Sequence, residues 1–277
     1  MQLQLPRRPV LIFYDSITRI ATVSAFAVGL CLPLTVVAEE PGERESSSTS
    51  WSLGLGGVSK QKPYTDIDRE NMAIPLLKFE NKYFHVFGPE VGFKLPGINI
   101  NDSQKLNFSI IAKYDGSGYE SDDAEILNDM SERKSGVWAG AKMEWNSNLF
   151  DINAEWLADA SSNSKGQRVN LTLERTWRLG EHVMLTPRVG VAWQDKKYVD
   201  YYYGVRDSEA RLGRPVYSGK SGANAEVGVR GIYMFDNRHS MLLDIEVSSL
   251  AKGIKDSPLV DSSTENRVFL GYMYRFR

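Results

Sequence analysis

The sequence predicts an all-β fold, an antiparallel transmembrane β-barrel of about 12 strands, and three observations support it. The segment from Arg267 to Arg277 alternates apolar and polar side chains, with Phe269 as the exception. A period of two residues is typical of a strand, because successive side chains point to opposite faces. Further segments of about ten residues repeat this alternation between turn residues, as in membrane barrels. The low mean hydropathy of −0.34 fits such a wall, since only alternate side chains face lipid.

The composition argues against other classes of protein. The formal net charge is −2, and the 33 Lys and Arg residues form no basic stripe, so we expect no nucleic-acid partner. After the N-terminal segment, no apolar run reaches the roughly 18 residues that a membrane-spanning helix requires. A barrel needs no such run, because its backbone hydrogen bonds form between strands.

Residues 1–38 have the pattern of a signal peptide. Three arginines precede a nearly uninterrupted apolar run at 20–37, and small residues lead to Ala38, after which we expect cleavage. A retained membrane anchor is the alternative interpretation. Cys31 is the sole cysteine and lies within this segment, so the expected mature chain has no disulfide framework.

Residues 39–50 form a polar, serine-rich segment without a core-forming residue, and we expect a periplasmic tether there. Residues 51–277 are then the barrel. Its clearest strand is 183–194, where apolar and polar or small side chains alternate throughout. Similar stripes occur around 106–114, 227–235 and 241–247. The strands expected in the first half are 51–57, 71–79, 83–87, 91–95, 105–115 and 136–146.

The connections set the topology. Short turns are expected at 146–148, 179–181, 236–238 and near Asn81, and longer polar connections at 116–134, 160–166, 196–222 and 251–264. In outer-membrane barrels short turns face the periplasm and long loops face outward. The final strand is expected to end on the periplasmic side, so the direction of each earlier strand follows by alternation. An even number of strands must then lie between the turn near Asn81 and the strand 105–115, and the short pair 83–87 and 91–95 supplies them, which gives about twelve strands. Ten strands are the alternative if that pair is irregular.

Charged side chains fall on the expected inner face of many strands, and their signs are nearly balanced. Pairs of opposite charge would cross-link the interior, whereas a selective pore concentrates one sign at a constriction. The pattern therefore favours a closed or narrow lumen. The expected inward charged residues are Lys142, Glu144, Asp151, Glu155, Arg168, Glu174, Arg178, Arg188, Glu226, Arg230, Asp244, Glu246, Arg267 and Arg275.

No catalytic, cofactor-binding or metal site is predicted. No serine is placed beside His85, His182 or His239 for a Ser-His-acid array, and no Gly-x-Ser-x-Gly elbow occurs. The acidic run from Asp66 to Glu70 lacks the glycine and closing glutamate of a calcium-binding loop, which favours a solvated external loop. We therefore expect no enzymatic activity and no cofactor.

Tyr198, Tyr201, Tyr202 and Tyr203 cluster in the longest expected loop. One interpretation is a platform on which sugars or peptidoglycan stack. The other is part of the aromatic girdle at the outer rim of the barrel, where amphipathic rings sit at the membrane interface. We favour the girdle.

Two blocks of sequence resemble the MipA/OmpV family of outer-membrane proteins. The first comprises Tyr202-Tyr203-Gly204-Val205, Ala210-Arg211, Tyr217 and Gly222-Ala223-Asn224, and the second comprises Lys255-Asp256-Ser257-Pro258-Leu259-Val260 with the final strand. The resemblance covers essentially residues 51–277. Phe276, followed by one arginine, also looks like the terminal assembly signal of bacterial outer-membrane barrels.

The resemblance implies a protein of the cell outer membrane of Gram-negative bacteria, in contact with outer-membrane lipid and lipopolysaccharide. Similar members are described as scaffolds that link a lytic transglycosylase to a penicillin-binding protein. A scaffold for peptidoglycan-remodelling enzymes is therefore the implied function, with the tether and the short turns as contact surface.

Two alternatives stay open beside the scaffold. A small-solute channel or receptor involved in envelope stress, adhesion or antibiotic response is the first, and a lipid-modifying enzyme that uses His85 is the second. The family supplies no catalytic residues. It points to Tyr203, Gly204, Tyr217, Asp256, Ser257 and Pro258 as positions that organise the loops.

Overall fold

The computed structural model describes residues 49–276. The expected signal peptide at 1–38, most of the expected tether at 39–50, and Arg277 lie outside the described residues. The strand segments are β1 (Ser50–Gln61), β2 (Glu70–Glu80), β3 (Phe84–Phe87), β4 (Glu90–Asn101), β5 (Gln104–Asp115), β6 (Gly136–Ser147), β7 (Asp151–Asp159), β8 (Gln167–Glu174), β9 (Trp177–Leu179), β10 (Val183–Gln194), β11 (Gly222–Met234), β12 (His239–Ser249) and β13 (Thr264–Arg275).

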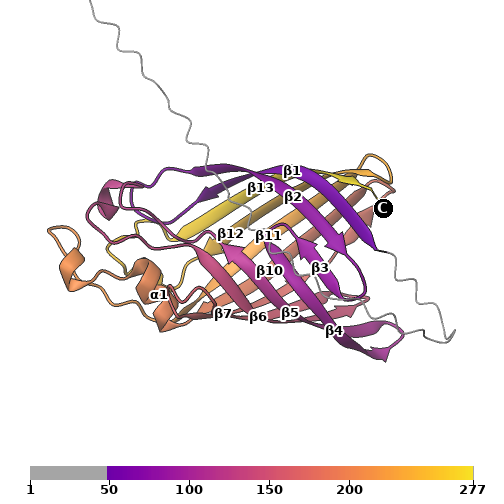
Figure 1. Cartoon of the computed structure of the whole chain (residues 1–277), viewed down its shortest axis with the longest axis horizontal. Coiled ribbons are helices and arrows are strands. Elements are labelled where there is room, and N and C mark those ends of the chain that lie inside the picture. The colour runs from indigo at the N-terminus through magenta and orange to yellow at the C-terminus, as the bar shows by residue number, and fades with distance from the viewer. Residues whose placement is uncertain (1–48, 277) are drawn as a thin grey trace, which may run out of the picture. The chain divides into compact units, whose positions relative to one another are not determined.

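These segments form one antiparallel sheet that closes on itself where β10 pairs with β11 (Figure 1). β8 and β9 both pair with β10, one after the other, so they are two parts of a single wall strand. The described barrel therefore has twelve strands, as predicted. The helical segments are short: α1 (Lys196–Tyr203), α2 (Lys252–Lys255), η1 (Glu125–Leu127) and η2 (Asp207–Glu209). Within 49–276, none of the helices is long and apolar enough to cross a membrane.

The connections divide the barrel into two ends. The turns at 81–83, 102–103, 148–150, 180–182 and 235–238 lie at one end with Ser50 and Arg275, which we call the short-turn end. The longer connections at 62–69, 116–135, 160–166, 195–221 and 250–263 lie at the other, which we call the loop end.

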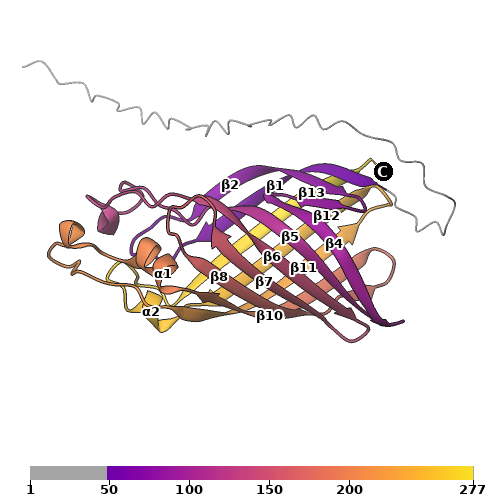
Figure 2. The same ribbon diagram turned by 60° about the horizontal axis from the view of Figure 1, so that its bottom comes forward.

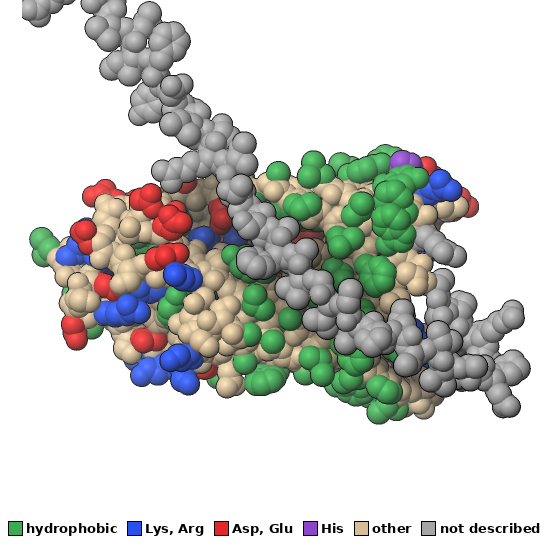
Figure 3. Space-filling model, viewed as in Figure 1, with side chains coloured by type: hydrophobic (Ala, Val, Ile, Leu, Met, Phe, Trp, Pro, Cys, Tyr) green, Lys and Arg blue, Asp and Glu red, His purple; other side chains and the backbone are tan. Residues whose placement is uncertain are grey.

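The outer face of the wall is apolar and the inner face largely polar. In β13, Leu270 and Tyr272 are exposed on the outside, whereas Phe269 and Met273 are buried on the inside. Figure 3 shows hydrophobic side chains spread over the wall, while most charged side chains of that face gather at the loop end. Lipid around the barrel requires such an outer surface.

Aromatic side chains contact one another near the short-turn end. Trp51 stacks on Phe276 with ring centroids 4.1 Å apart, and Tyr274 meets Phe276 edge-on at 4.7 Å. His239 extends the series by an edge contact of 4.9 Å with Tyr274. Amphipathic rings of this kind mark the level at which a barrel wall leaves the hydrocarbon.

The short pair expected at 83–87 and 91–95 is present, but its second strand is longer than the sequence suggested. β4 continues to Asn101, through a bulge at which its register with β5 shifts between Leu95 and Ile98. Pro96 and Gly97 lie within that bulge. Proline is tolerated in a strand at a bulge or an edge, so the Pro-Gly pair bends this strand without ending it.

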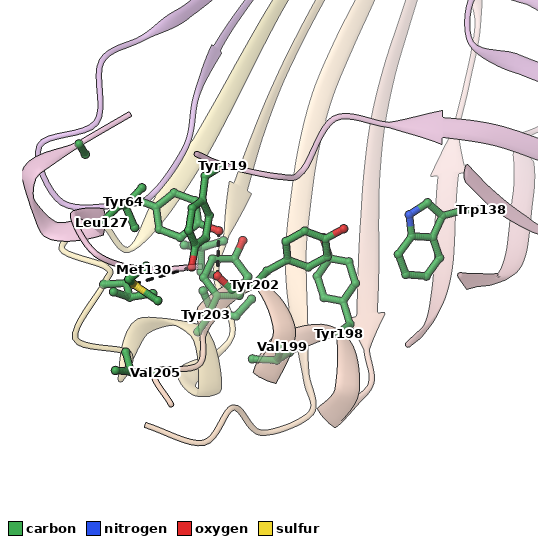
Figure 4. Packing of buried hydrophobic residues seen from close by; sticks show 14 of the residues in the cluster. Tyr64, Tyr119, Leu127, Met130, Trp138, Tyr198, Val199, Tyr202, Tyr203 and Val205 are labelled. Carbon is green, nitrogen blue, oxygen red and sulfur yellow. Dashed lines mark hydrogen bonds between the residues drawn. The ribbon is translucent and has the colours of Figure 1, made fainter. Parts of the chain in front are cut away.

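The long loops pack together over the loop end. Their buried cluster, which we call the loop core, draws Tyr64, Tyr119, Val199 and Leu259 from four different connections. Figure 4 shows the rings of Tyr64 and Tyr119 close to those of Tyr202 and Tyr203. The hydroxyl of Tyr64 donates to the carbonyl of Tyr202 at 3.0 Å. A cluster of this size holds the four connections in one arrangement.

The tyrosine cluster does not form the expected girdle, and that prediction is wrong. Asp195 caps α1 by accepting from the N–H of Tyr198 at 2.8 Å, and the helix places the rings of Tyr198, Tyr202 and Tyr203 in the loop core. The ring of Tyr198 lies 5.6 Å from Trp138 on the inner wall. Because these three rings are buried, they also offer no open surface for stacking a sugar.

Candidate functional site

A polar chamber of about 460 Å³ lies inside the barrel beneath the loop core. Its wall carries equal numbers of cationic and anionic side chains, which agrees with the balanced inward charge that the sequence predicts. Most of the expected inward residues contribute to it. The charged lining residues are Lys60, Lys62, Lys113, Asp115, Lys142, Glu144, Glu155, Arg168, Glu174, Arg188, Glu226, Arg230, Glu246 and Glu265.

One ion-pair network connects four consecutive strands. Arg188 of β10 binds Asp244 at 2.8 Å and Glu246 at 2.6 Å, both on β12. Arg230 of β11 reaches Asp244 at 3.2 Å, and Arg267 of β13 lies 3.5 Å from both acids. The charges therefore cross-link the interior as expected, although Arg188 reaches past the adjacent strand to the next one.

A second set of contacts crosses the opposite wall. Lys113 of β5 binds Glu155 of β7 at 2.7 Å, and Arg168 of β8 binds Asp115 at the end of β5. The guanidinium of Arg168 also lies 4.2 Å from the ring centroid of Trp138. These contacts tie the chamber to the loop core, because Arg168 lines the chamber and Trp138 belongs to the loop core.

Part of the interior is apolar, which the sequence reasoning missed. This apolar inner wall consists of Val58, Ile74, Leu76, Leu242, Phe269 and Met273. A Cβ added to Gly56 or Gly271 would lie 2.8 Å from the ring of Phe269, so these glycines make room for that ring. The available signal was Phe269 itself, because it breaks the alternation of the final strand in favour of a large apolar inward side chain.

An ion pair in the loop core joins the connections 116–135 and 195–221. The Arg133 guanidinium lies 2.8 Å from the Glu209 carboxylate, and both side chains are almost fully buried. Burial would raise the pKa of Glu209, but hydrogen bonds from Arg133 and from the backbone of Arg206 lower it to about 2. The carboxylate is therefore charged throughout the physiological range.

Arg214 makes a second link between the same connections. Its buried guanidinium donates to the carbonyls of Glu209 at 2.7 Å and Asn128 at 2.8 Å, and also to that of Ile126. A guanidinium whose donors all meet carbonyl oxygens orients several backbone segments at once. Arg133 and Arg214 thus both hold the connections 116–135 and 195–221 together.

The six positions pointed out by the family resemblance lie where two loops meet. The ring of Tyr203 stacks on that of Tyr64 at 5.5 Å, and its carbonyl accepts from the Ser257 hydroxyl at 2.6 Å. Ser257 also accepts from the N–H of Leu259 at 3.2 Å. Gly204 ends α1, where a Cβ would lie 2.2 Å from the carbonyl oxygen of Asp200.

The other three positions are close by. The Tyr217 hydroxyl donates to the carbonyl of Gly253 at 2.7 Å, and Tyr217 forms a bridge with Val205. Asp256 ends α2 in helical backbone geometry, and Pro258 is half-buried after Ser257. The structure therefore brings all six together around the contact of α1 with the connection 250–263.

The histidines contact no serine hydroxyl within the described residues. His85 lies 3.3 Å from Glu90, His182 bonds the carbonyl of Met234 at 2.8 Å, and His239 bonds a tyrosine hydroxyl. Across 49–276, no three His, Cys, Asp or Glu side chains gather as metal ligands. What the described residues supply at the chamber is charge, hydrogen bonds and enclosed space.

Comparison with known proteins agrees with this architecture. The family model described as MltA-interacting protein MipA matches residues 53–276. A putative outer membrane protein YiaT of Escherichia coli K12 is 26% identical over 85% of this chain and 95% of its own. The MltA-interacting protein of E. coli K12 is 25% identical over 82% of this chain and 90% of its own. The outer membrane protein OmpV of Vibrio cholerae is 24% identical over 82% of this chain and 86% of its own.

Solved structures are more distant. An outer membrane channel from Pseudomonas putida F1 aligns over 86% of this chain and all of its own, with a TM-score of 0.43 and 12% identity. The NanC porin aligns over 81% and 98%, with a TM-score of 0.39 and 9% identity. The strand pairing, the apolar outer face and the match over residues 53–276 together show that this chain is an outer-membrane β-barrel that belongs to the MipA/OmpV family.

Proposed function

We propose that this protein is a scaffold that holds murein-remodelling enzymes at the periplasmic face of the outer membrane. One family relative is named an MltA-interacting protein, which supports a lytic transglycosylase as the partner class. A penicillin-binding protein would be the second enzyme of such an assembly. The short-turn end is the periplasmic end by the rule that short turns face inward, so the contact surface belongs there.

The observation that carries the proposal is the hairpin of β4 and β5 at this end (Figure 2). β3 begins at Phe84, so residues 95–101 of β4 pair with β5 alone among the described strands. Side chains on both faces of 95–101 are exposed, including Ile98 and Ile100. The hairpin thus continues past its neighbour on one side and leaves a free strand edge.

A free edge can accept a strand from a partner. Unpaired N–H and C=O groups give affinity by adding a strand, and alternate side chains give specificity. Apolar Ile98 and Ile100 alternate with Asn99 and Asn101, which suits an extended segment that carries both apolar and amide-bearing side chains. We propose this edge, together with the expected tether at 39–50, as the contact for the transglycosylase.

Binding of the purified barrel to an MltA-type transglycosylase tests the scaffold. The double variant Ile98→Asp/Ile100→Asp should weaken binding at least tenfold, because it places charge on the contact edge. Leu149→Asp is the matched control, since Leu149 is exposed in another periplasmic turn. Unchanged binding of the double variant, or equal loss in the control, would contradict the hairpin as the contact.

A small-solute channel or receptor is the second candidate, and the chamber favours it. Its volume of about 460 Å³ and its charges of both signs suit a polar solute. Reproducible open currents through the barrel in a planar bilayer would support a channel. A closed barrel that binds solute without conducting would favour a receptor.

We also propose that the six family positions fix the loops over the chamber. Tyr203, Ser257 and Tyr217 supply the contacts between the connections, and Gly204, Asp256 and Pro258 supply the chain reversals. Lipid and lipopolysaccharide would surround the wall below these loops. Replacement of Ser257 by Ala, followed by proteolysis of the loops on whole cells, tests this role.

A further inference from the structure

The barrel wall is incomplete between β2 and β5 on the side of the loop end. β3 pairs with β2 only at residues 78–80, and the N–H of Gly88 in the β3–β4 turn donates to the carbonyl of Leu77 at 3.0 Å. Beyond that bond, residues 70–77 pair with β1 alone among the described strands. β3 is visibly the shortest arrow of this wall in Figure 1. β3 and β4 therefore stop short of the loop end, which their neighbours β2 and β5 reach.

Contacts around the rim bound this opening. On its lower side the carbonyl of Pro89 accepts from the N–H of Tyr114 at 3.1 Å. On its upper side the ammonium of Lys62 donates to the carbonyl of Gly118 at 2.7 Å, which joins the connection 62–69 to the segment after β5. We call the area enclosed by residues 70–77, these two contacts and the segment 114–118 the lateral window.

The sequence of β2 fits an edge at this window. Because backbone groups alternate in direction along a strand, Pro75 presents its nitrogen on the same side as the Leu77 carbonyl, which is the window side. Proline has no N–H and is confined to edge positions or bulges within sheets. Asn71 and Ala73 direct their backbone groups the same way. An open edge at membrane depth is tolerated where it lines a water-filled space, so the window is wet from the chamber side.

Apolar side chains line the interior beside the window. Met72 and Ile74 lie on the inner face of β2, and Met72 stands opposite Val58 of β1. Met72 is 43% exposed although it faces inward, whereas Leu76 below it is buried against Phe269. Met72, Ile74 and Val58 thus give the inner wall beside the window an apolar surface.

Charges of both signs lie directly above this surface. Lys60 stands opposite Glu70 in the β1–β2 register, and the ammonium of Lys62 lies 3.2 Å from Glu70. Glu265 lines the same part of the chamber from β13. Among the described residues, Lys60 and Glu265 make no direct ion pair, and each is the main electrostatic partner of the other, so a ligand with charges of both signs fits between them.

The outer face leads to the same edge. A groove of about 370 Å³ crosses β13, β1 and β2, floored at Gly57 and Ala73 and flanked by Val268 and Leu270. Ala73 is itself a residue of the window edge. A hydrocarbon chain lying in this groove would thus meet the window from the membrane.

We propose that the lateral window binds a single-chain amphiphile with a zwitterionic head, taken from the outer leaflet. The chain contacts Met72, Ile74 and Val58, and the head meets Lys60 and Glu265 in the wet chamber. A head that carries both signs fits better than a simple anion, because Glu265 lies near Lys60 and Glu70 pairs with Lys62. This site is independent of the proposed scaffold, which uses the opposite end of the barrel.

Photo-crosslinking tests the location. A benzoylphenylalanine placed at Met72 in the barrel, reconstituted in phospholipid vesicles with radiolabelled lysophosphatidylethanolamine, should capture at least fivefold more label than one at Thr172. Thr172 lines the chamber on β8, away from the window. Equal or absent capture at Met72 would overturn the proposal, because the chain would then not enter through the window.

Two substitutions test the chemistry. Lys60→Met and Ile74→Asn should each reduce capture at Met72 at least fivefold, while the matched control Lys142→Met leaves it unchanged. Heat-modifiable migration in gels verifies that each variant is folded. Palmitate that competes as well as the lysophospholipid would overturn the zwitterionic head, and unchanged capture in Lys60→Met would overturn the placement of the head.

Discussion

Arg188 on β10 reaches past β11 to hold Asp244 on β12 at 2.8 Å, so the contact joins two strands that share no backbone hydrogen bonds. Such a contact adds a cross-tie to a wall that is otherwise held together between neighbours. The same guanidinium binds Glu246 at 2.6 Å, so its donors meet two carboxylates. Bidentate and charge-assisted bonds of this type are the strong ones.

Removing this cross-tie should destabilise the barrel. Arg188→Met leaves Asp244 with the longer contacts to Arg230 and Arg267, and the loss of one partner from a buried pair costs about 3–5 kcal/mol. Urea unfolding of the barrel in detergent, followed by tryptophan fluorescence, measures this change. The control is Arg178→Met, since Arg178 is exposed outside this network. An equal effect in both variants would contradict the cross-tie.

The loop core should loosen in acid because of Glu209. Its folded pKa of about 2 is below the ordinary value of 4.5, so its contribution is present above the ordinary value. That contribution is lost as the pH falls from about 4.5 through about 2. Hydrogen exchange in 120–133 and 205–217 should therefore accelerate over this window. In Glu209→Gln the acid-dependent part should disappear, and a persistent transition would contradict the assignment.

Gly204 should tolerate no side chain. Its φ of −78° is ordinary, so the expected cost is steric: a Cβ would lie 2.2 Å from the carbonyl of Asp200. Gly204→Ala should destabilise the loop core by about 1–3 kcal/mol, as overpacking does. Gly116→Ala is the matched loop control, because its Cβ meets nothing within 4 Å. Protease cleavage of the loops in intact vesicles, compared between the two variants, measures the difference.

Phe269 should contribute to stability from inside the barrel. Phe269→Ala opens a cavity in the apolar inner wall and should cost about 3–5 kcal/mol. Leu270→Ala, on the lipid-facing side of the same strand, should cost less because lipid can fill the space. Denaturant midpoints of the two variants in the same detergent check this order. If Leu270→Ala proved the more damaging change, the inward packing of Phe269 would be refuted.

The wall could be predicted from local patterns. Alternation such as that of 183–194 depends only on which face of the wall meets lipid. It therefore predicts both that the segment is a strand and which of its side chains point outward. The parity of short and long connections then gives about twelve strands, with ten as the alternative, and the structure has twelve although β3 has only four residues. The full length of β4 could not be foreseen, because Pro96-Gly97 is compatible with a turn or a bulge until the register with β5 is known.

The interior was less accessible to sequence reasoning. Tyrosines such as Tyr198 and Tyr202 are also typical of an interfacial girdle, so their residue type does not show that they are buried. Their burial depends on contacts with Tyr64 and Trp138, which are remote in sequence. The balanced charges of the chamber were foreseen, but the reach of Arg188 over an intervening strand requires the curvature of the closed wall.

The shortness of β3 also has a mechanical consequence. A closed sheet resists changes in its cross-section. Flattening it would strain the hydrogen bonds between at least one pair of neighbouring strands. Between β2 and β5 the strand pairing is interrupted at the loop end, and only the loop contacts close the wall there, whereas strand pairing is continuous toward the short-turn end. Fluctuations in the cross-section of this barrel should therefore be largest beside the interruption between β2 and β5, at the loop end.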